Sequence, residues 1–231
     1  LEPDGYLNHD IQGASLQVAA RHHARTGIDP TAELQRATES LSRALALKPG
    51  FPPAYNKLGN VYLSLVVQGR KVGRDVFEDF LAGSGYYERA IQASPDFLLP
   101  YTNLIAISAH RMDQLKEWGR FDSALFEKSK QVHRQCKAKN AAYLYCDLAF
   151  VNVLGARLSV HEATGAPIAQ DYDDVMELVT SIEQRHKNDI YALQEEMAAH
   201  ATLAQHQLRA QENAAGVLGR LDSALLRCTA T

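Results

Sequence analysis

The sequence predicts an all-α fold, built from about five antiparallel helical hairpins that stack as a solenoid. Three observations predict it: an internal repeat of 46 residues, apolar residues at helical spacing within each repeat, and glycine and proline where helices should end. A repeat of this length indicates stacking, because a single hairpin cannot bury its apolar face alone. We therefore expect one repeat domain over 1–231, with repeats at approximately 6–51, 52–97, 98–143, 144–189 and 190–231.

The repeat is visible as four series of residues in one phase, each with a step of 46. The first is glycine throughout: Gly27, Gly73, Gly119 and Gly165. The other three are almost entirely apolar: Leu34, Phe80, Phe126, Tyr172 and Leu218; Leu41, Tyr87, His133, Val179 and Leu225; and Ala44, Ala90, Cys136, Ile182 and Cys228. One glycine series would be weak evidence, but four series in the same phase are strong evidence.

Within a repeat, apolar residues recur at three- and four-residue intervals, which predicts an amphipathic helix. One such stripe is Leu34, Ala37, Leu41, Ala44 and Leu45, and another is Leu58, Val61, Tyr62 and Leu65. No run of alternating β-branched residues indicates a strand.

The helix ends are also marked in the sequence. Gly27 and Gly73 suit the left-handed cap that ends a helix. Asp29 and Pro30 suit the N-cap and first turn of the next helix. Pro49 and Pro95 should stop the second helix of their repeats. The fifth repeat is less regular, because 219–225 copies 119–125 almost letter for letter and would place its turn eight residues late.

Composition narrows the class of protein. The 231 residues are 46% hydrophobic and 22% charged with a net charge of -3, which predicts a globular chain and gives no basic excess for nucleic acid. No apolar run is long enough to cross a membrane, and nothing resembles a secretion signal. Three widely spaced cysteines, Cys136, Cys146 and Cys228, argue against a disulfide framework and for the cytoplasm. The first residue is not methionine, so we expect a piece of a longer polypeptide.

The residues also resemble a known family. Tyr55, Leu58, Gly59 and Tyr62 match the W-x2-L-G-x2-Y start of the tetratricopeptide (TPR) consensus, with tyrosine in place of tryptophan, and Ala37, Leu41, Ala44 and Pro49 match its second half. The usual period is shorter, and the extra residues fall between Tyr62 and Gly83. This lengthened form is similar to repeats that follow the catalytic domain in some bacterial serine/threonine protein kinases.

The resemblance implies a right-handed α-solenoid whose first helices line a concave groove. It places nine polar or aromatic residues on that groove: Asn56, Asn60, Thr102, Asn103, His110, Tyr145, Asn152, Tyr191 and Gln194. An asparagine amide both donates and accepts hydrogen bonds, as does a peptide backbone. Two interpretations stay open for this set: contact with a bound partner, or solvated polar positions on amphipathic helices.

No motif for catalysis or for a cofactor is present, neither a phosphate-binding glycine loop nor a nucleophile elbow. His133 and Cys136 could form one edge of a metal site, but they occupy packing positions of the repeat and lack further ligands. The acidic residues Asp171, Asp173 and Asp174 suit the first turn of a helix better than a cation site. His200 is expected to be solvated or to lie at an interface.

We therefore expect a non-catalytic protein–protein interaction module without cofactor or metal, in a regulatory or sensory region of a larger bacterial signalling protein such as a serine/threonine kinase. Its partner would be a protein or peptide in the groove, which could be a domain of the same polypeptide, and neither nucleic acid nor a membrane. The alternatives are a free-standing scaffold or oligomerisation protein, and a metal-dependent enzyme that uses the histidines and aspartates.

Overall fold

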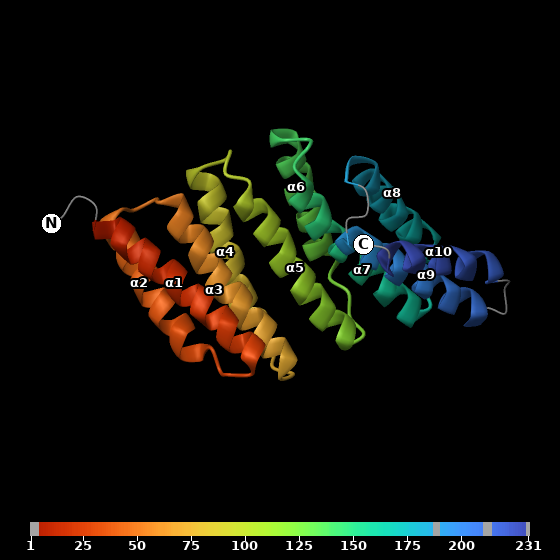
Figure 1. Ribbon diagram of the computed structural model, residues 1–231, viewed down its shortest axis with the longest axis horizontal. Helices are drawn as coiled ribbons and strands as arrows, with labels where there is room; N and C mark the ends of the chain where they lie inside the picture. Colours follow the sequence, from red (N-terminus) through yellow and green to blue (C-terminus); the bar gives the residue numbers. More distant parts are fainter. Residues whose placement is uncertain (1–4, 187–189, 210–213, 230–231) are drawn as a thin grey trace. The chain divides into compact units, whose positions relative to one another are not determined.

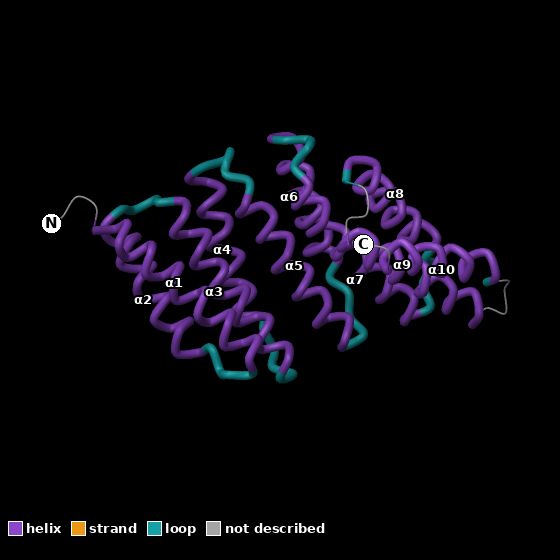
Figure 2. Tube along the Cα trace, in the orientation of Figure 1, coloured by secondary structure: helices purple, strands orange, loops and turns teal. Residues whose placement is uncertain are grey.

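The computed structural model describes residues 5–186, 190–209 and 214–229, without the side chains of Ile190, Tyr191, Ala192, Glu195, Arg209 and Thr229. Within these ranges the chain forms ten α-helices and no β-strand (Figure 1 and Figure 2). The helices are α1 (Gly5–Thr26), α2 (Thr31–Leu47), α3 (Pro52–Lys71), α4 (Phe77–Ala93), α5 (Leu99–Glu117), α6 (Ser123–Lys139), α7 (Leu144–Thr164), α8 (Ala169–Arg185), α9 (Ile190–Arg209) and α10 (Ala215–Thr229). The predicted all-α fold is confirmed.

The chain divides into two compact units, Leu1–Arg111 (unit 1) and Met112–Thr231 (unit 2). In unit 1, α1 packs on α2 and α3 packs on α4; in unit 2, α7 packs on α8 and α9 packs on α10. The single domain expected from the repeat stays a prediction. Among the described helices, none combines the length and the apolar character needed to span a bilayer.

The helices follow the spacing seen in the sequence. The second helices α2, α4, α6, α8 and α10 begin at residues 31, 77, 123, 169 and 215, so each starts 46 residues after the one before. The first helices begin at residues 5, 52, 99, 144 and 190, at intervals of 45 to 47 residues. The structure therefore repeats a pair of helices.

Glycine ends four of the five first helices. Gly27, Gly73, Gly119 and Gly165 have φ between 66° and 78°, in the left-handed region. The N–H of the next residue donates to the carbonyl five residues earlier at 2.8–2.9 Å in all four turns, as in a Schellman motif. A Cβ built on any of these glycines would meet no atom within 4 Å. Glycine is thus required by the backbone conformation and not by crowding, and the predicted caps are confirmed.

The other helix ends agree closely with the sequence. The helices α2 and α4 stop at Leu47 and Ala93, two residues before Pro49 and Pro95. Asp29 Oδ1 accepts hydrogen bonds from the hydroxyl and the backbone N–H of Thr31, at 2.6 and 3.0 Å, and these bonds lower the pKa of Asp29. Because α2 begins at Thr31, Pro30 is the N-cap residue and Asp29 lies one residue before it. The predicted N-cap at Asp29 and the predicted first-turn position of Pro30 are therefore both wrong by one residue.

Each hairpin of unit 1 closes where a glycine faces a large side chain. Gly59 on α3 lies against the ring of Tyr87 on α4, and Gly13 on α1 lies against Leu41 on α2. The two pairs occupy the same repeat positions, one step of 46 apart. Tyr87 and Leu41 are fully buried, as the apolar stripes predict. A side chain on either glycine would push the two helices of its pair apart.

The fifth repeat has the register of the other four, and not the late turn that the copied segment suggested. Its second helix starts at Ala215, in phase with the other four, and Gly219 lies inside that helix with α-helical neighbours on both sides. The copied segment 219–225 is therefore helical, although its counterpart 119–125 begins in a turn. The residues before it, 210–213, lie outside the described part of the chain.

The expectation that the cysteines are unpaired is also wrong. Cys136 at the end of α6 and Cys146 at the start of α7 form a disulfide, with their Cα atoms 6.6 Å apart, and Cys228 is unpaired. The two cysteines are only ten residues apart, and the short turn between α6 and α7 brings them together. This pairing removes the cysteine-based reason for a reducing compartment.

A buried carboxylate joins three helices of unit 2. The side chain of Asp147 on α7 is 2% exposed and lies 2.7 Å from His133 Nε2 and Lys137 Nζ of α6 and from Arg185 Nη2 of α8. Burial alone would raise the pKa of Asp147, but the hydrogen bonds from His133, Lys137 and Arg185 outweigh it and lower the pKa to about 2. Asp147 is therefore ionised at neutral pH and holds α6, α7 and α8 together.

Substitution Gly59→Ala should destabilise the protein, because the added methyl group overlaps the buried ring of Tyr87. We expect a loss of about 1–3 kcal/mol in the free energy of unfolding, measured by urea denaturation. Gly85→Ala is the matched control, since a Cβ at this helical position meets nothing within 4 Å. It should leave stability unchanged or raise it by up to about 1 kcal/mol. Equal effects of the two substitutions would contradict this account.

Substitution Asp147→Asn should lower stability in a pH-dependent way. The pKa of Asp147 is lower in the folded protein than the ordinary value of 3.8, so its contribution is complete above that value and is lost as the pH falls towards about 2. We expect a loss of about 2 kcal/mol at neutral pH that shrinks steadily below about pH 4. Urea unfolding over this pH range measures it.

The exposed Asp173 provides the control for Asp147, because Asp173→Asn makes the same change of charge in the same unit. Its effect on the free energy of unfolding should be within about 0.5 kcal/mol of zero. If the loss caused by Asp147→Asn were the same at acid and at neutral pH, the role assigned to its ionised form would be wrong.

Candidate functional site

Three of the asparagines predicted to face a partner come together in unit 1. Asn56 and Asn60 lie one turn apart on α3, and Asn103 comes from α5. Asn103 Nδ2 donates to Asn56 Oδ1 and to Asn60 Oδ1, each at 3.0 Å. We call these three residues the asparagine cluster.

A buried tyrosine fixes the orientation of the cluster. Tyr87 Oη donates to Asn60 Oδ1 at 2.8 Å. Burial raises the pKa of Tyr87 well above its ordinary value, so the hydroxyl stays protonated and can only be a donor towards this oxygen. Asn60 Oδ1 thus accepts two hydrogen bonds, which assigns its amide nitrogen to the opposite side.

The cluster keeps polar groups that form no hydrogen bond within the described part of the chain: Nδ2 of Asn56, Nδ2 of Asn60 and Oδ1 of Asn103. None of these atoms is among the fully buried atoms without a partner. Two amide nitrogens and one amide oxygen therefore keep the capacity to form hydrogen bonds, although Asn56 as a whole is only 6% exposed. These groups match the carbonyl and N–H groups of an extended peptide.

The other predicted residues of unit 1 lie on α5. His110 Nδ1 is 3.1 Å from Nη1 of Arg70 on α3. Thr102, next to Asn103 in sequence, is half-buried. The cluster and these two residues show that α3 and α5 carry most of the predicted positions in unit 1.

The predicted residues of unit 2 are more dispersed. Tyr145 is 60% exposed and packs edge-on against Tyr143. Asn152 is exposed and donates to the carbonyl of Leu148 in its own helix at 2.9 Å. Gln194 is exposed on α9, and the side chain of Tyr191 lies outside the described residues. Their role in binding a partner stays a prediction.

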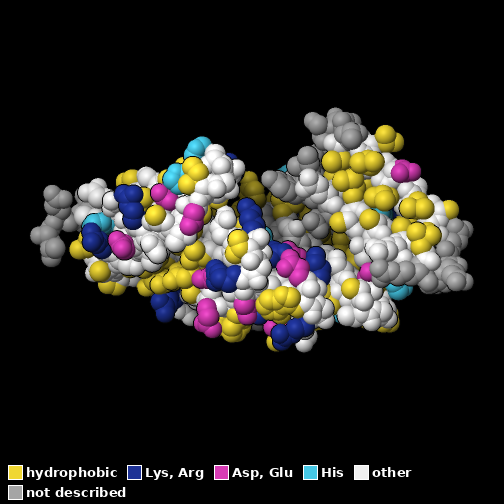
Figure 3. Space-filling view, turned by 90° about the horizontal axis from the view of Figure 1, so that it is seen from below, with side chains coloured by type: hydrophobic (Ala, Val, Ile, Leu, Met, Phe, Trp, Pro, Cys, Tyr) yellow, Lys and Arg dark blue, Asp and Glu magenta, His cyan; other side chains and the backbone are white. Residues whose placement is uncertain are grey.

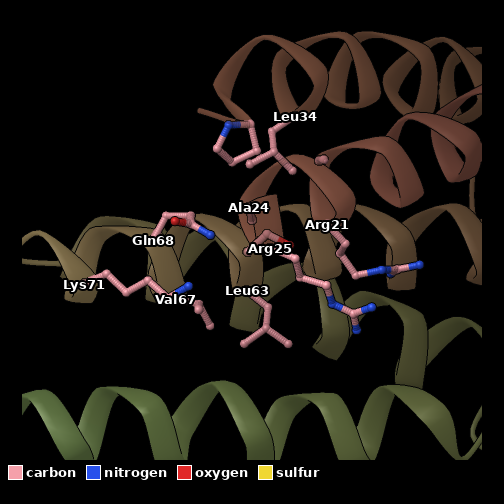
Figure 4. Close-up of a pocket in the computed structure, with 11 residues that line it drawn as sticks. Arg21, Ala24, Arg25, Leu34, Leu63, Val67, Gln68 and Lys71 are labelled. Carbon is pink, nitrogen blue, oxygen red and sulfur yellow. The ribbon is translucent and has the colours of Figure 1, made fainter. Parts of the chain in front are cut away.

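A hollow in unit 1 was not predicted from the sequence. It has a volume of about 410 Å³ and lies between the C-terminal halves of α1 and α3, next to the start of α2 (Figure 4). Its polar lining includes Arg21 and Arg25 from α1 and Lys71 from α3, and its apolar lining includes Leu63 and Val67 from α3. We call this feature the basic hollow.

The sequence did contain a signal for the basic hollow. Arg25 and Lys71 are separated by one repeat step of 46, and Arg21 lies one helical turn before Arg25. The three side chains come together only because α1 lies beside α3. The spacing in the sequence therefore indicates the hollow only if equivalent positions of neighbouring repeats are assumed to be adjacent in space.

Asp171, Asp174 and His200, considered as metal ligands or as solvated side chains, contact other side chains of the protein. Asp171 is buried and pairs with Arg157 Nε at 2.8 Å and His161 Nδ1 at 2.5 Å, and Asp174 pairs with the same arginine. His200 is 1% exposed and lies 2.8 Å from Tyr172 Oη, so its predicted solvated or interfacial position is wrong. Burial lowers the pKa of His200. No group of three or more potential metal ligands occurs among the described residues.

Hydrophobic side chains are exposed on the surface over the C-terminal helices (Figure 3). On α10 these include Leu218, Leu225 and Leu226, which are 42%, 51% and 70% exposed. Leu218 and Leu225 are seven residues apart and therefore lie on one face of the helix.

Comparisons with known proteins give little beyond the fold. No family model matches the chain, and no curated protein matches it. Among solved structures, the chain is similar to the crystal structure of a thermophilic TPR protein of Thermus thermophilus, with 15% sequence identity and a TM-score of 0.47 over 93% of this chain and 99% of that chain. A likeness of this degree does not assign the chain to a family.

Proposed function

We propose that this chain is a non-catalytic protein–protein interaction module that binds an extended peptide segment along α3 and α5. The observation that carries the proposal is the asparagine cluster, which keeps two amide donors and one acceptor available for a ligand. Helical repeats offer long surfaces for this kind of recognition because successive first helices lie side by side.

The cluster is suited to the backbone of a ligand more than to its side chains. A peptide unit presents one carbonyl and one N–H, and a primary amide can bind both. Tyr87 holds Asn60 in place from the core, so little side-chain entropy is lost when a ligand binds. Recognition through the backbone tolerates many sequences, so specificity has to come from a neighbouring surface.

The setting we propose is a regulatory or sensory region of a larger bacterial signalling protein, such as a serine/threonine kinase, in the cytoplasm. The support for this setting is that the lengthened repeat resembles repeats that follow the catalytic domain in some bacterial serine/threonine protein kinases. In such a protein the bound segment could belong to another domain of the same polypeptide. Within unit 1, Thr102 and His110 of α5 would extend the contact surface.

Substitution Asn103→Ala tests the proposal, since it removes both hydrogen bonds that order the cluster and the acceptor it offers. Peptides selected from a random phage-displayed library against the full chain serve as ligands. We expect their Kd to rise by about tenfold, as the loss of one or two hydrogen bonds predicts. Isothermal titration calorimetry measures the change.

The control for Asn103 is Asn8→Ala, an exposed asparagine on α1 that forms no hydrogen bond within the described part of the chain. Its Kd should stay within about twofold of the original. Thermal unfolding by circular dichroism verifies that both variants are folded. Selected peptides that bind both variants as tightly as the original chain would exclude the cluster as the binding site.

A second function, self-association, is favoured by the exposed leucines of α10. Apolar side chains that are exposed together on one face of a helix promote contacts between chains.

Light scattering coupled to size-exclusion chromatography tests this second function. If α10 mediates self-association, the mass should rise with concentration, and Leu225→Glu with Leu226→Glu should restore the monomer. Leu81→Glu, at an exposed leucine of α4, should not change the mass. A monomer at every concentration up to about 0.5 mM would exclude self-association of physiological strength.

A further inference from the structure

The basic hollow is open, sizeable and bounded by two helices, one of which, α3, also carries the predicted binding surface. A second hollow of about 550 Å³ adjoins it and shares Ala24, Pro30, Gln68 and Lys71 with it. Together they form a continuous groove from the middle of α3 to the turn that follows it. A groove of this extent can receive several side chains of a bound segment.

The charge of the basic hollow is not balanced by the protein. Arg21, Arg25 and Lys71 form no ion pair and no hydrogen bond within the described part of the chain, and no acidic residue lines the hollow. These three exposed cations line one hollow and create a positive potential there. An anionic group on a ligand would be attracted to this potential.

Three other cations of unit 1 are paired with carboxylates. Lys57 lies 2.5 Å from Asp10, Arg74 lies 2.6 Å from Asp79, and Arg111 pairs with a carboxylate at 2.7 Å. The three cations of the basic hollow have no such partner among the described residues, and they share this with the exposed Arg43 on α2. What distinguishes them is that they line one hollow.

The floor of the hollow is apolar. Leu63 and Val67 of α3 are half-buried, and Ala24 and Leu34 complete this lining (Figure 4). Apolar surface in a concave site favours a ligand that can cover it, at about 25 cal/mol for each Å² removed from water. A ligand with only charged groups would leave this apolar surface exposed to water.

The basic hollow and the asparagine cluster lie on one stripe of α3. Asn60, Leu63, Val67 and Lys71 follow each other at intervals of three and four residues, so their side chains share a face. The eleven-residue step from Asn60 to Lys71 spans about 16 Å of helix. An extended peptide covers this length with about five residues.

We infer that the basic hollow binds acidic and apolar side chains of a peptide segment whose backbone is held, about five residues away, by the asparagine cluster. The inference rests on the proposed function and names the chemistry of its ligand: a segment in which pairs of acidic residues alternate with pairs of leucine-like residues, so that each face of the extended segment carries both kinds. The hollow lies in the part of the helices beyond the consensus match at Tyr62, so the extra helical turns supply the specificity.

Three fluorescein-labelled peptides of about ten residues test the inference with the full chain by fluorescence anisotropy. They contain pairs of glutamate alternating with pairs of leucine, pairs of lysine alternating with pairs of leucine, and pairs of glutamate alternating with pairs of serine. We expect the glutamate–leucine peptide to bind at least about tenfold more tightly than the other two. Its affinity should fall as the NaCl concentration rises, because exposed charges are screened.

The double variant Arg25→Glu and Lys71→Glu should raise the Kd of the glutamate–leucine peptide at least about tenfold and should improve binding of the lysine–leucine peptide. The matched control is Arg43→Glu, an exposed arginine on α2 outside the hollow, with no expected change. Thermal unfolding checks that each variant is folded, and the neutral pair Arg25→Gln and Lys71→Gln should weaken binding in the same direction.

The outcomes separate this inference from the proposed function. An unchanged Kd in the double variant, together with weaker binding in Asn103→Ala, would overturn the basic hollow as the site and leave the proposed function intact. An unchanged Kd in both variants would overturn both. Oleate combines a carboxylate with an apolar chain, and if it bound in the hollow while no peptide did, the ligand would be a small amphiphile and the inference would be wrong.

Discussion

The packing of this protein depends on how closely the two helices of each hairpin can approach each other. In the second repeat the approach is set by Gly59, which leaves room for the ring of Tyr87 between α3 and α4. In the fourth repeat the equivalent positions hold Val151 and Val179, both buried. A very small and a very large side chain are replaced by two of middle size, so that the shared volume is kept. Tight packing requires this complementarity, because a void or an overlap of one methyl group in the core lowers the stability of the protein.

This packing also reaches the candidate site. Tyr87 fills the space above Gly59 with its ring and donates from its hydroxyl to Asn60, so the same side chain closes the hairpin and orients the asparagine cluster. Asn103 then ties α5 to α3 through two hydrogen bonds. A binding surface held in this way is preorganised, which reduces the entropy lost on binding.

The elements that the sequence predicted well are those with a local cause. The turn glycines follow from backbone conformation, and the buried stripe from Leu34 to Ala44 follows from helical periodicity. The features it missed depend on which helices meet. The pairing of Cys136 with Cys146 requires the turn between α6 and α7, and the basic hollow requires α1 beside α3. Within the site, the resemblance placed the three asparagines on the first helices, but the hydrogen bond from Tyr87 to Asn60 could be seen only in three dimensions.

Asp147 bears on whether the repeats can be exchanged with each other. It stands where the first helices of the second and third repeats carry Tyr55 and Tyr101, and its cations come from the helix before and the helix after its own. If the hairpin of α7 and α8 were moved elsewhere in the chain, the carboxylate of Asp147 would lose its partners His133 and Lys137. The fourth repeat therefore depends on the helix before it. Duplication or shuffling of repeats during evolution would have to move α6, α7 and α8 together to keep Asp147 paired.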